Sequence, residues 1–261
     1  MKNTALTLAL TLLAGHAQAA LQGKNVSYNG GGVQMKGYVV YDDQFAGKRP
    51  AVLVVHEWWG LNAHARDRAE QLAKAGYIAM AVDMYGNGKQ ADHPDNAMAF
   101  MQAATRDTAQ TTARFRAAEK LLKAHKRADP GKLAAIGYCF GGAVVLNMAR
   151  QGEALKGVAS FHGALGAWQP ASPGQVRPKV LVMTGADDSM VPAEAVAKFE
   201  SEMQAAQADY RVISYPGAKH SFTNPAADDF AKKFNMPVAY NAEADKASWA
   251  ELQQFLKEVF H

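Results

Sequence analysis

The fold is decided by residues 134–142, which read AAIGYCFGG. The apolar residues before Cys139 predict a buried strand over residues 132–139, and the residues from Gly141 onward predict a helix. Gly137 and Gly141 lie two residues either side of Cys139, the only cysteine in the chain. Glycines at these positions allow a tight strand-to-helix turn in which side chains have no room. The pattern predicts a sharp turn that holds Cys139 above the end of a strand.

This geometry is typical of a nucleophile elbow, a turn that presents a reactive side chain to a substrate. In the simpler alternative, Cys139 is a small buried residue at the end of a strand, as most free cysteines are. The flanking glycines favour the elbow. A helix N-terminus also stabilises a thiolate, because its free N–H groups and positive dipole end favour negative charge. We therefore predict that Cys139 is a nucleophile.

Length and composition predict one globular domain with no polymer partner. The chain has 261 residues, of which 49% are hydrophobic and 20% charged, and its formal net charge is +4. Basic and acidic residues are interspersed, which argues against nucleic-acid binding. No phosphate-loop or dinucleotide motif and no metal-ligand spacing occurs, so we expect neither a cofactor nor a metal. We expect a monomer.

The first 20 residues have the pattern of a secretory signal peptide. A basic start at Lys2 precedes a short apolar run over residues 4–15, and residues 17–19 (AQA) form a small-x-small cleavage site. The apolar run is too short to span a bilayer. We expect residues 1–20 to be removed and residues 21–261 to form a single exported domain, periplasmic or secreted, that is not inserted in a membrane. The alternative is a frayed N-terminal helix on a cytosolic protein.

The rest of the chain predicts strands that alternate with helices. Predicted strands cover residues 33–41, 50–56, 77–83, 132–139, 157–161, 179–184 and 210–215. Predicted helices cover residues 63–75, 96–126 and 193–208, a stretch that begins at 141, and a final helix through 249–260. The alternation predicts an α/β fold with a mostly parallel sheet and helices on both faces. In such sheets, functional loops gather at the carboxyl ends of the strands.

A base for the nucleophile is predicted at one of these strand ends. His220 follows the last predicted strand, in the stretch AKHSF that begins at Ala218. His56 and His162 also end strands and remain alternatives, although both suit a buried structural role. Because the histidine comes last in a chain order of nucleophile, acid and base, we predict that His220 is the base.

An acid to orient the base is predicted after the strand over residues 179–184. Two candidates are adjacent, Asp187 and Asp188, and either could simply cap the helix that begins after Pro192. The spacing from Asp188 to the Val-Pro pair favours Asp188 as the orienting acid.

The loop after the predicted strand over residues 50–56 reads EWWG from Glu57. An oxyanion hole in this arrangement takes one N–H from the residue after the nucleophile and one from this loop, which predicts Phe140 and Trp58. Glu57 is predicted to point into the pocket and to hold the proton of Cys139 until a substrate displaces it. The alternative for Glu57 is a solvated loop charge.

Together these motifs resemble the dienelactone hydrolase family (carboxymethylenebutenolidases), cysteine hydrolases of the α/β-hydrolase fold. The resemblance begins near Val39, runs to the C-terminus, and is most specific over residues 56–60, 82–85, 137–142 and 218–222. It implies these roles: Cys139 as nucleophile, His220 as base, Asp188 as orienting acid, Glu57 as the carboxylate that controls thiol ionisation, and Trp58 and Phe140 as oxyanion donors.

The resemblance also implies a small-molecule ester or lactone as substrate. The best-known members carry two arginines that bind a substrate carboxylate, whereas this chain has Asn87 and Asn224 at those places. We therefore expect a neutral, apolar substrate that contacts Trp59, Tyr85 and Phe222 as well as these two asparagines. A general carboxylesterase or thioesterase with the same triad, and a non-catalytic binding protein on the same scaffold, are the alternatives.

Overall fold

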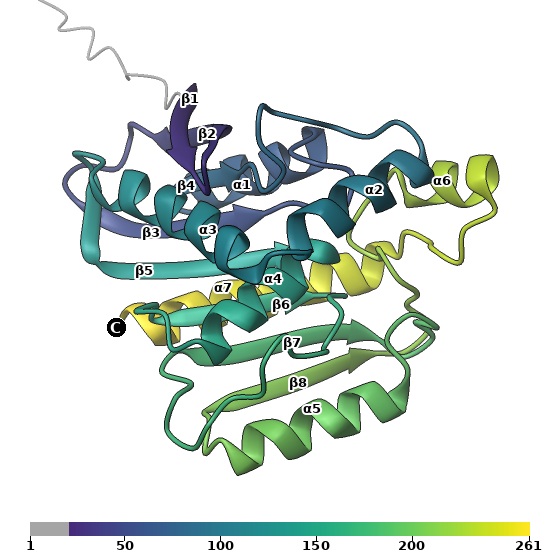
Figure 1. Cartoon of the computed structure of the whole chain (residues 1–261). Helices are drawn as coiled ribbons and strands as arrows, with labels where there is room; N and C mark the ends of the chain where they lie inside the picture. Colours follow the sequence, from purple (N-terminus) through teal and green to yellow (C-terminus); the bar gives the residue numbers. More distant parts are fainter. Residues whose placement is uncertain (1–20) are drawn as a thin grey trace, which may run out of the picture.

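The computed structural model describes residues 21–261, so the predicted signal peptide over residues 1–20 lies outside the described part of the chain. The described residues form one eight-stranded sheet in the order β1-β2-β4-β3-β5-β6-β7-β8 (Figure 1). The strands are β1 (Leu21–Gly30), β2 (Val33–Asp42), β3 (Arg49–Val55), β4 (Ile78–Val82), β5 (Ala128–Tyr138), β6 (Gly157–Phe161), β7 (Lys179–Gly185) and β8 (Tyr210–Tyr215). The pairs β1–β2 and β2–β4 are antiparallel, and the strands from β4 to β8 in sheet order are parallel.

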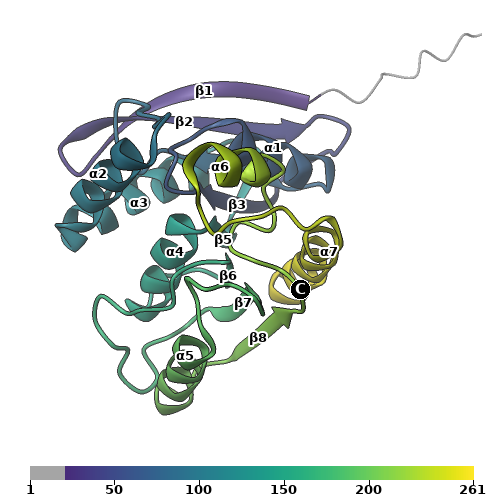
Figure 2. The ribbon, with the colours of Figure 1, turned by 90° about the vertical axis from the view of Figure 1, so that its right-hand side faces the viewer.

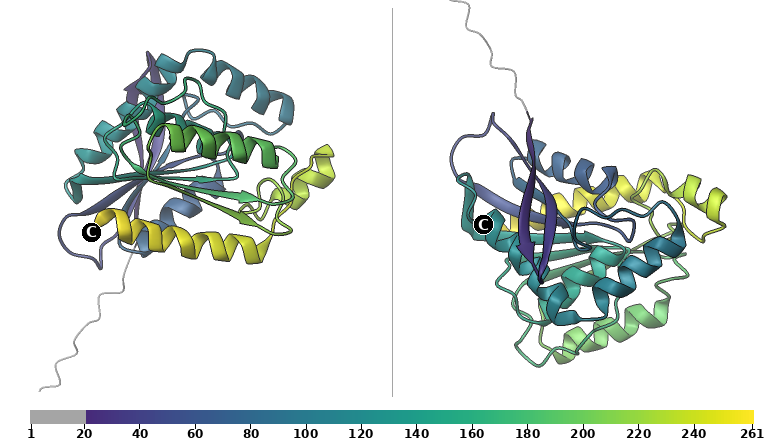
Figure 3. Two further views of the ribbon diagram at one scale, coloured as in Figure 1. Left: turned by 90° about the horizontal axis from the view of Figure 1, so that it is seen from below. Right: turned by 45° about the horizontal axis from the view of Figure 1, so that its top comes forward.

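Helices cover both faces of the sheet, as the alternating pattern predicts. They are α1 (Ala63–Lys74), α2 (Pro94–Thr105), α3 (Thr108–Lys123), α4 (Phe140–Arg150), α5 (Ala193–Ala205), α6 (Ala227–Phe234) and α7 (Ala242–Phe260). In the left view of Figure 3, α5 and α7 lie on opposite sides of the sheet. The prediction of an α/β fold with a mostly parallel sheet is confirmed.

Two apolar cores result, because successive side chains of a strand point to opposite faces. In β3, Leu53 and Val55 pack toward α3, α4 and α5, whereas Val52 and Val54 pack toward α1 and α7. The middle strands are therefore apolar at nearly every position, as is usual for parallel strands that are buried on both faces.

The prediction of one continuous helix over residues 96–126 is wrong. The structure has two helices there, because the Asp107 side chain accepts hydrogen bonds from the N–H groups of Ala109 and Gln110 and so caps a new helix. Thr111 Oγ1 also donates to the carbonyl of Ala104, which stabilises the break between α2 and α3.

Two elements were not predicted from the sequence. β1 pairs with β2 over ten residues, yet most of its side chains are exposed, so it shows no apolar alternation. Helix α6 is only eight residues long and has one fully buried residue, Ala227. Both elements depend on neighbours that are distant in the sequence rather than on local periodicity.

The parallel strands end at one edge of the sheet, which faces the viewer in Figure 2. Helices α2 and α6 lie above this edge, and α6 follows the loop after β8. No helix within residues 21–261 is long and apolar enough to cross a membrane. Cys139, Asp188 and His220 follow β5, β7 and β8 at this edge.

Candidate functional site

Cys139 lies at the sharp turn between β5 and α4, as the glycine pattern predicts. Its backbone has φ 50° and ψ −114°, a left-handed conformation that is rare for a residue with a side chain. A Cβ atom on Gly137 would lie 2.1 Å from the Gly141 carbonyl oxygen, and one on Gly141 would lie 2.3 Å from the Val55 carbonyl oxygen. Only glycine fits at these two positions, so the flanking glycines allow the turn to form.

His220 and Asp188 form a buried pair close to Cys139. The Nδ1 atom of His220 lies 2.9 Å from Oδ2 of Asp188, and Oδ1 of Asp188 accepts a hydrogen bond of 2.8 Å from the Met190 N–H. Asp188 is 3% exposed, whereas its neighbour Asp187 is exposed to solvent. The structure thus pairs Asp188, and not Asp187, with the histidine.

The charge state of His220 follows from its neighbours. Burial by itself lowers the pKa of His220, but attraction to Cys139 and Asp188 outweighs it and raises the pKa to about 10. The other ring nitrogen, Nε2, is buried without a regular hydrogen bond within residues 21–261. A pKa raised in this way favours the imidazolium form of His220 at neutral pH, with Cys139 as the neighbour that can exchange a proton with the ring.

The two alternative histidines are buried and neutral. Burial lowers the pKa of both His56 and His162. His162 Nε2 lies 2.9 Å from Thr223 Oγ1, and its ring packs edge-on against His220 at 5.2 Å between centroids. Both nitrogens of His56 contact backbone groups. Neither histidine pairs with a carboxylate side chain, which leaves His220 as the histidine of this site.

The two predicted oxyanion donors, Phe140 and Trp58, both lie at the cavity that contains Cys139. Phe140 is the first residue of α4, and Trp58 belongs to the loop after β3. Across residues 21–261, neither backbone N–H donates to a protein acceptor. Both residues line the cavity that contains Cys139. Two free N–H groups beside a nucleophile can bind a developing negative charge on oxygen.

Glu57 does not occupy the predicted position beside the thiol. Its side chain is 2% exposed, does not line the cavity, and accepts a hydrogen bond from Asn224 Nδ2. Burial raises the pKa of Glu57, and hydrogen bonds from Asn224 and Ser221 offset this only in part. The described residues show no hydrogen bond between Glu57 and Cys139, so Glu57 instead joins the loop after β3 to the loop after β8.

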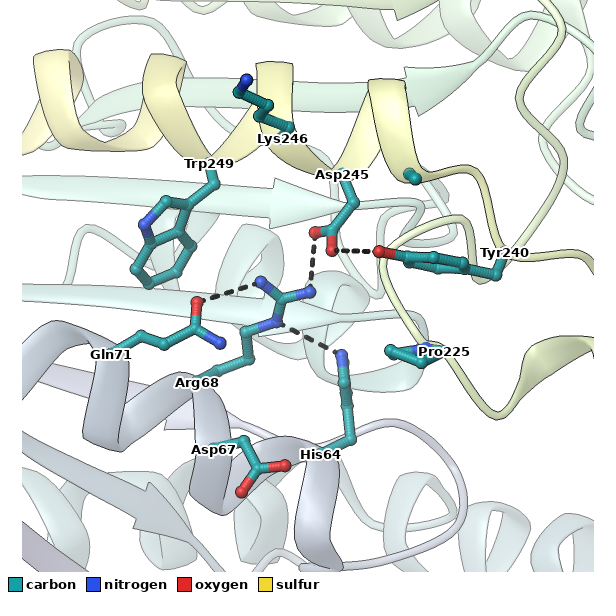
Figure 4. Close-up of a pocket in the computed structure, with 10 residues that line it drawn as sticks. His64, Asp67, Arg68, Gln71, Pro225, Tyr240, Asp245, Lys246 and Trp249 are labelled. Carbon is teal, nitrogen blue, oxygen red and sulfur yellow. Dashed lines mark hydrogen bonds and ion pairs between the residues drawn. The ribbon is translucent and has the colours of Figure 1, made fainter.

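A second, polar pocket of about 370 Å³ adjoins Glu57 through His64, whose Nδ1 lies 3.8 Å from Glu57 Oε2. Figure 4 shows Arg68 of α1 reaching toward Asp245 of α7, with an ion-pair distance of 2.6 Å, and toward His64. Sequence reasoning missed this network, because helical residues without a motif carry no signal of a partner in another helix. The positive charge of Arg68 lowers the pKa of Glu57, so this network affects a residue that supports the site without lining the Cys139 cavity.

The cavity at Cys139 has a volume of about 540 Å³ and apolar walls. Its lining residues are Trp58, Trp59, Met98, Met101, Thr105, Cys139, Phe140, Ala143, Ala164, Gly166, Trp168, Met190, Val191, His220, Ser221, Phe230, Met236 and Val238. This lining contains no lysine, arginine, aspartate or glutamate. The cavity therefore suits a neutral, apolar ligand.

The predicted substrate residues divide into two groups. Trp59 lines the cavity. Tyr85, Phe222 and Asn224 are buried and Asn87 is exposed at a turn with φ 57°, so none of these four lines the cavity, and their contact with a substrate stays a prediction. The Tyr85 hydroxyl, for example, points toward the protein and donates to the Trp58 carbonyl at 2.8 Å.

A metal centre is not indicated by the side chains. Within residues 21–261, no group of three or more histidine, cysteine, aspartate or glutamate residues is arranged to hold a metal ion. The groups of this site that are available for chemistry are the thiol of Cys139, the imidazole of His220 and the backbone N–H groups of Trp58 and Phe140.

The charge of His220 is testable by titration. We expect its ring resonances in wild-type protein to titrate near pH 10, and in Cys139→Ala at lower pH, because the negative partner is gone while burial remains. The raised pKa adds to the free energy of unfolding fully below about pH 6.5, and this contribution is lost as the pH rises toward about 10. Histidine-selective NMR measures the pKa directly, with Asp187→Asn as the unchanged control. Titration of wild-type His220 at or below pH 6.5 would contradict the ion pair.

Comparison with known proteins agrees with this geometry. The sequence model of the dienelactone hydrolase family matches residues 35–260. The solved structure of m3DLH is 36% identical with a TM-score of 0.86, and that of P91, a dienelactone hydrolase-like promiscuous phosphotriesterase from metagenomic libraries, is 34% identical with a TM-score of 0.84. Each comparison covers 93% of this chain and 100% of the other. A Synechocystis protein provisionally named carboxymethylenebutenolidase is 26% identical over 238 residues, 86% of this chain and 92% of its own. The chain belongs to the dienelactone hydrolase family and is a hydrolase of that type.

Proposed function

We propose that this chain is an exported cysteine hydrolase that cleaves a neutral, apolar lactone or carboxylic ester with Cys139, His220 and Asp188. One observation carries the proposal: the hydrogen-bonded His220–Asp188 pair lies beside Cys139 at the wall of an apolar cavity. The arrangement matches the roles of nucleophile, base and orienting acid in a triad. The two free N–H groups of Trp58 and Phe140 complete it.

In the first half of the reaction, the Cys139 sulfur attacks the carbonyl carbon of the substrate. A carbon–sulfur bond forms, and the carbonyl oxygen takes a negative charge that the N–H groups of Trp58 and Phe140 stabilise. The carbon–oxygen bond of the ester then breaks, and His220 gives its proton to the leaving alkoxide. The product is a thioester on Cys139; for a lactone, the alcohol remains tethered to the acyl group.

In the second half, water replaces the leaving group. The now neutral His220 takes a proton from the water, which attacks the thioester carbon through the same oxyanion geometry. The carbon–sulfur bond breaks, the acid is released, and the sulfur and imidazolium return as an ion pair. Asp188 holds the Nδ1 side of the ring throughout, which keeps Nε2 directed at the reacting atoms.

Glu57 and Asn224 support this site from behind rather than reacting. Their hydrogen bond joins the loop that carries Trp58 to the loop that carries His220, across 167 positions of sequence. A correct distance between the oxyanion donors and the imidazole depends on the relative position of these loops, and small displacements in a catalytic site are costly.

The triad assignment predicts a sharp difference between two adjacent aspartates. Cys139→Ala is expected to lower kcat by roughly 10⁴-fold or more, and Asp188→Asn by up to about 10⁴-fold, because the histidine loses its orienting acid. Asp187→Asn is the matched control and should leave kcat nearly unchanged, since Asp187 is exposed. Hydrolysis of p-nitrophenyl butyrate, with mass spectrometry of the trapped acyl-enzyme, measures both effects.

A panel of substrates, tested on the wild type and on the same variants, separates the candidate activities. A panel of p-nitrophenyl esters, lactones and acyl thioesters ranks the substrate classes, and a neutral phosphotriester belongs in it because P91 is a promiscuous phosphotriesterase. A binding protein on a hydrolase scaffold would turn over no member of the panel. Wild-type turnover in Cys139→Ala would overturn the nucleophile assignment.

The lack of lysine and arginine in the cavity lining predicts the charge preference of the enzyme. A substrate carboxylate entering the cavity loses water, and the cationic group of the lining, His220, is already paired with Asp188, so kcat/KM is expected to be at least about tenfold higher for a neutral methyl ester than for the corresponding acid. Met190 lines the cavity and is 50% exposed, which makes it a suitable place to add a charge. Met190→Arg should reduce the preference for the ester by roughly two- to fivefold, the effect of one exposed ion pair.

Met190→Gln is the matched control, since it adds polarity without charge. The test compares kcat/KM for the acid and its methyl ester in the wild type, Met190→Arg and Met190→Gln. A wild-type preference for the acid would contradict a neutral substrate and would indicate a cation that reaches the cavity from elsewhere.

Export is the remaining part of the proposal, and it is supported by the signal-like residues 1–20. When the full chain is produced in a Gram-negative host, we expect the protein in the periplasmic fraction with a mature N-terminus at Ala20 or Leu21, by intact mass. Lys2→Glu combined with Leu10→Asp should leave the precursor in the cytoplasm, because the basic start and the apolar run are both disrupted. Full-length protein in the cytoplasm of the wild-type culture would contradict export.

A further inference from the structure

We propose that His56 is a positioning residue for the oxyanion hole: it fixes the peptide group between Glu57 and Trp58, whose N–H is the predicted donor to the substrate oxygen. The inference rests on the proposed function, because it assigns a purpose to a donor that acts only if the chain forms a tetrahedral intermediate. His56 touches neither the cavity nor the reacting atoms. It would act entirely through the backbone.

The tautomer of His56 follows from its two contacts. The Met84 N–H donates to Nε2 at 3.2 Å, so Nε2 carries no proton. Burial lowers the pKa of His56, which keeps the ring neutral, and a neutral ring has its one proton on the other nitrogen. Nδ1 therefore donates to the carbonyl oxygen of Glu57, its close contact. The ring therefore accepts a hydrogen bond from the Met84 N–H and donates one to the Glu57 carbonyl.

The Met84 donor is itself held in place. Asp83 accepts hydrogen bonds from the N–H groups of Tyr85 and Gly86 through Oδ1, at 2.9 and 2.8 Å, and from Gly88 through Oδ2 at 2.9 Å. These bonds order the turn after β4, which presents Met84 to the histidine. The position of the ring is thus determined by a buried turn and not by solvent.

The consequence for the oxyanion hole comes from peptide geometry. The Glu57 carbonyl and the Trp58 N–H belong to one planar trans peptide group, so they point in opposite directions. A donor that fixes the carbonyl also fixes the direction of the N–H, and it polarises that N–H toward a stronger hydrogen bond. The Tyr85 hydroxyl holds the next peptide in the same way, through the Trp58 carbonyl at 2.8 Å.

Two polar substitutions separate this role from simple packing. The amide nitrogen of asparagine can take the place of Nδ1, so His56→Asn keeps a donor for the Glu57 carbonyl. The amide of glutamine reaches the place of Nε2, so His56→Gln keeps an acceptor for Met84 but leaves the Glu57 carbonyl without its donor. His125→Gln is the control for the substitution itself, because His125 is half-buried before β5, at the opposite end of that strand from Cys139.

Two reactions of Cys139 are measured on each variant. Hydrolysis of p-nitrophenyl butyrate needs the oxyanion hole, whereas alkylation by iodoacetamide is a displacement at saturated carbon and develops no oxyanion. We expect His56→Gln to lower kcat about ten- to hundredfold at nearly constant KM, with the alkylation rate unchanged. His56→Asn is expected to keep kcat within about threefold of wild type, since the donor to the Glu57 carbonyl remains.

Equal kcat in the glutamine and asparagine variants, or an equal loss of hydrolysis and alkylation in His56→Gln, would overturn the proposal. If His56→Asn fails to fold by circular dichroism, the comparison of hydrolysis with alkylation in His56→Gln still decides it. Failure of the proposed function has a different signature: either the wild-type protein hydrolyses no substrate, or hydrolysis survives in Cys139→Ala regardless of residue 56.

Discussion

The site depends on one backbone hydrogen bond, from the Gly141 N–H to the His56 carbonyl at 3.1 Å. This bond joins the elbow after β5 to the loop after β3, and it forms only because Gly141 has no side chain to separate them. The same approach brings the N–H groups of Phe140 and Trp58 to one wall of the cavity. Cys139 and the two proposed oxyanion donors are therefore positioned by close backbone packing, which does not vary with side-chain rotamers.

Around this frame, the buried ionisable groups are arranged in partnered layers. Asp188 and His220 form the layer next to the sulfur, and Glu57 with Asn224 forms the next. Arg68 and Asp245 form a third layer at the polar pocket in Figure 4. Buried charges are costly unless they are paired and hydrogen-bonded, so each layer limits the movement of the one before it.

The walls of the cavity come from different parts of the chain than its reactive groups. Methionines from α2 and from the loops after β7 and α6 line it, and two of them, Met98 and Met190, are 41% and 50% exposed. Methionine is flexible and polarisable and fits apolar groups of varied shape. The cavity walls thus come largely from loops and peripheral helices, whereas Cys139, Asp188 and His220 follow the ends of strands.

The sequence by itself determined the α/β class, the elbow at Cys139 and the positions of His220 and Asp188, because these depend on local patterns: strand periodicity, glycine spacing and the chain order of strand ends. The edge strand β1 and helix α6 have weak periodicity and escaped prediction. Only the tertiary structure decided that Glu57 bonds Asn224 instead of reaching the thiol, and that the Tyr85 hydroxyl bonds the Trp58 carbonyl. The direction of a side chain in a loop depends on which distant segment packs against it, and no local pattern records that contact.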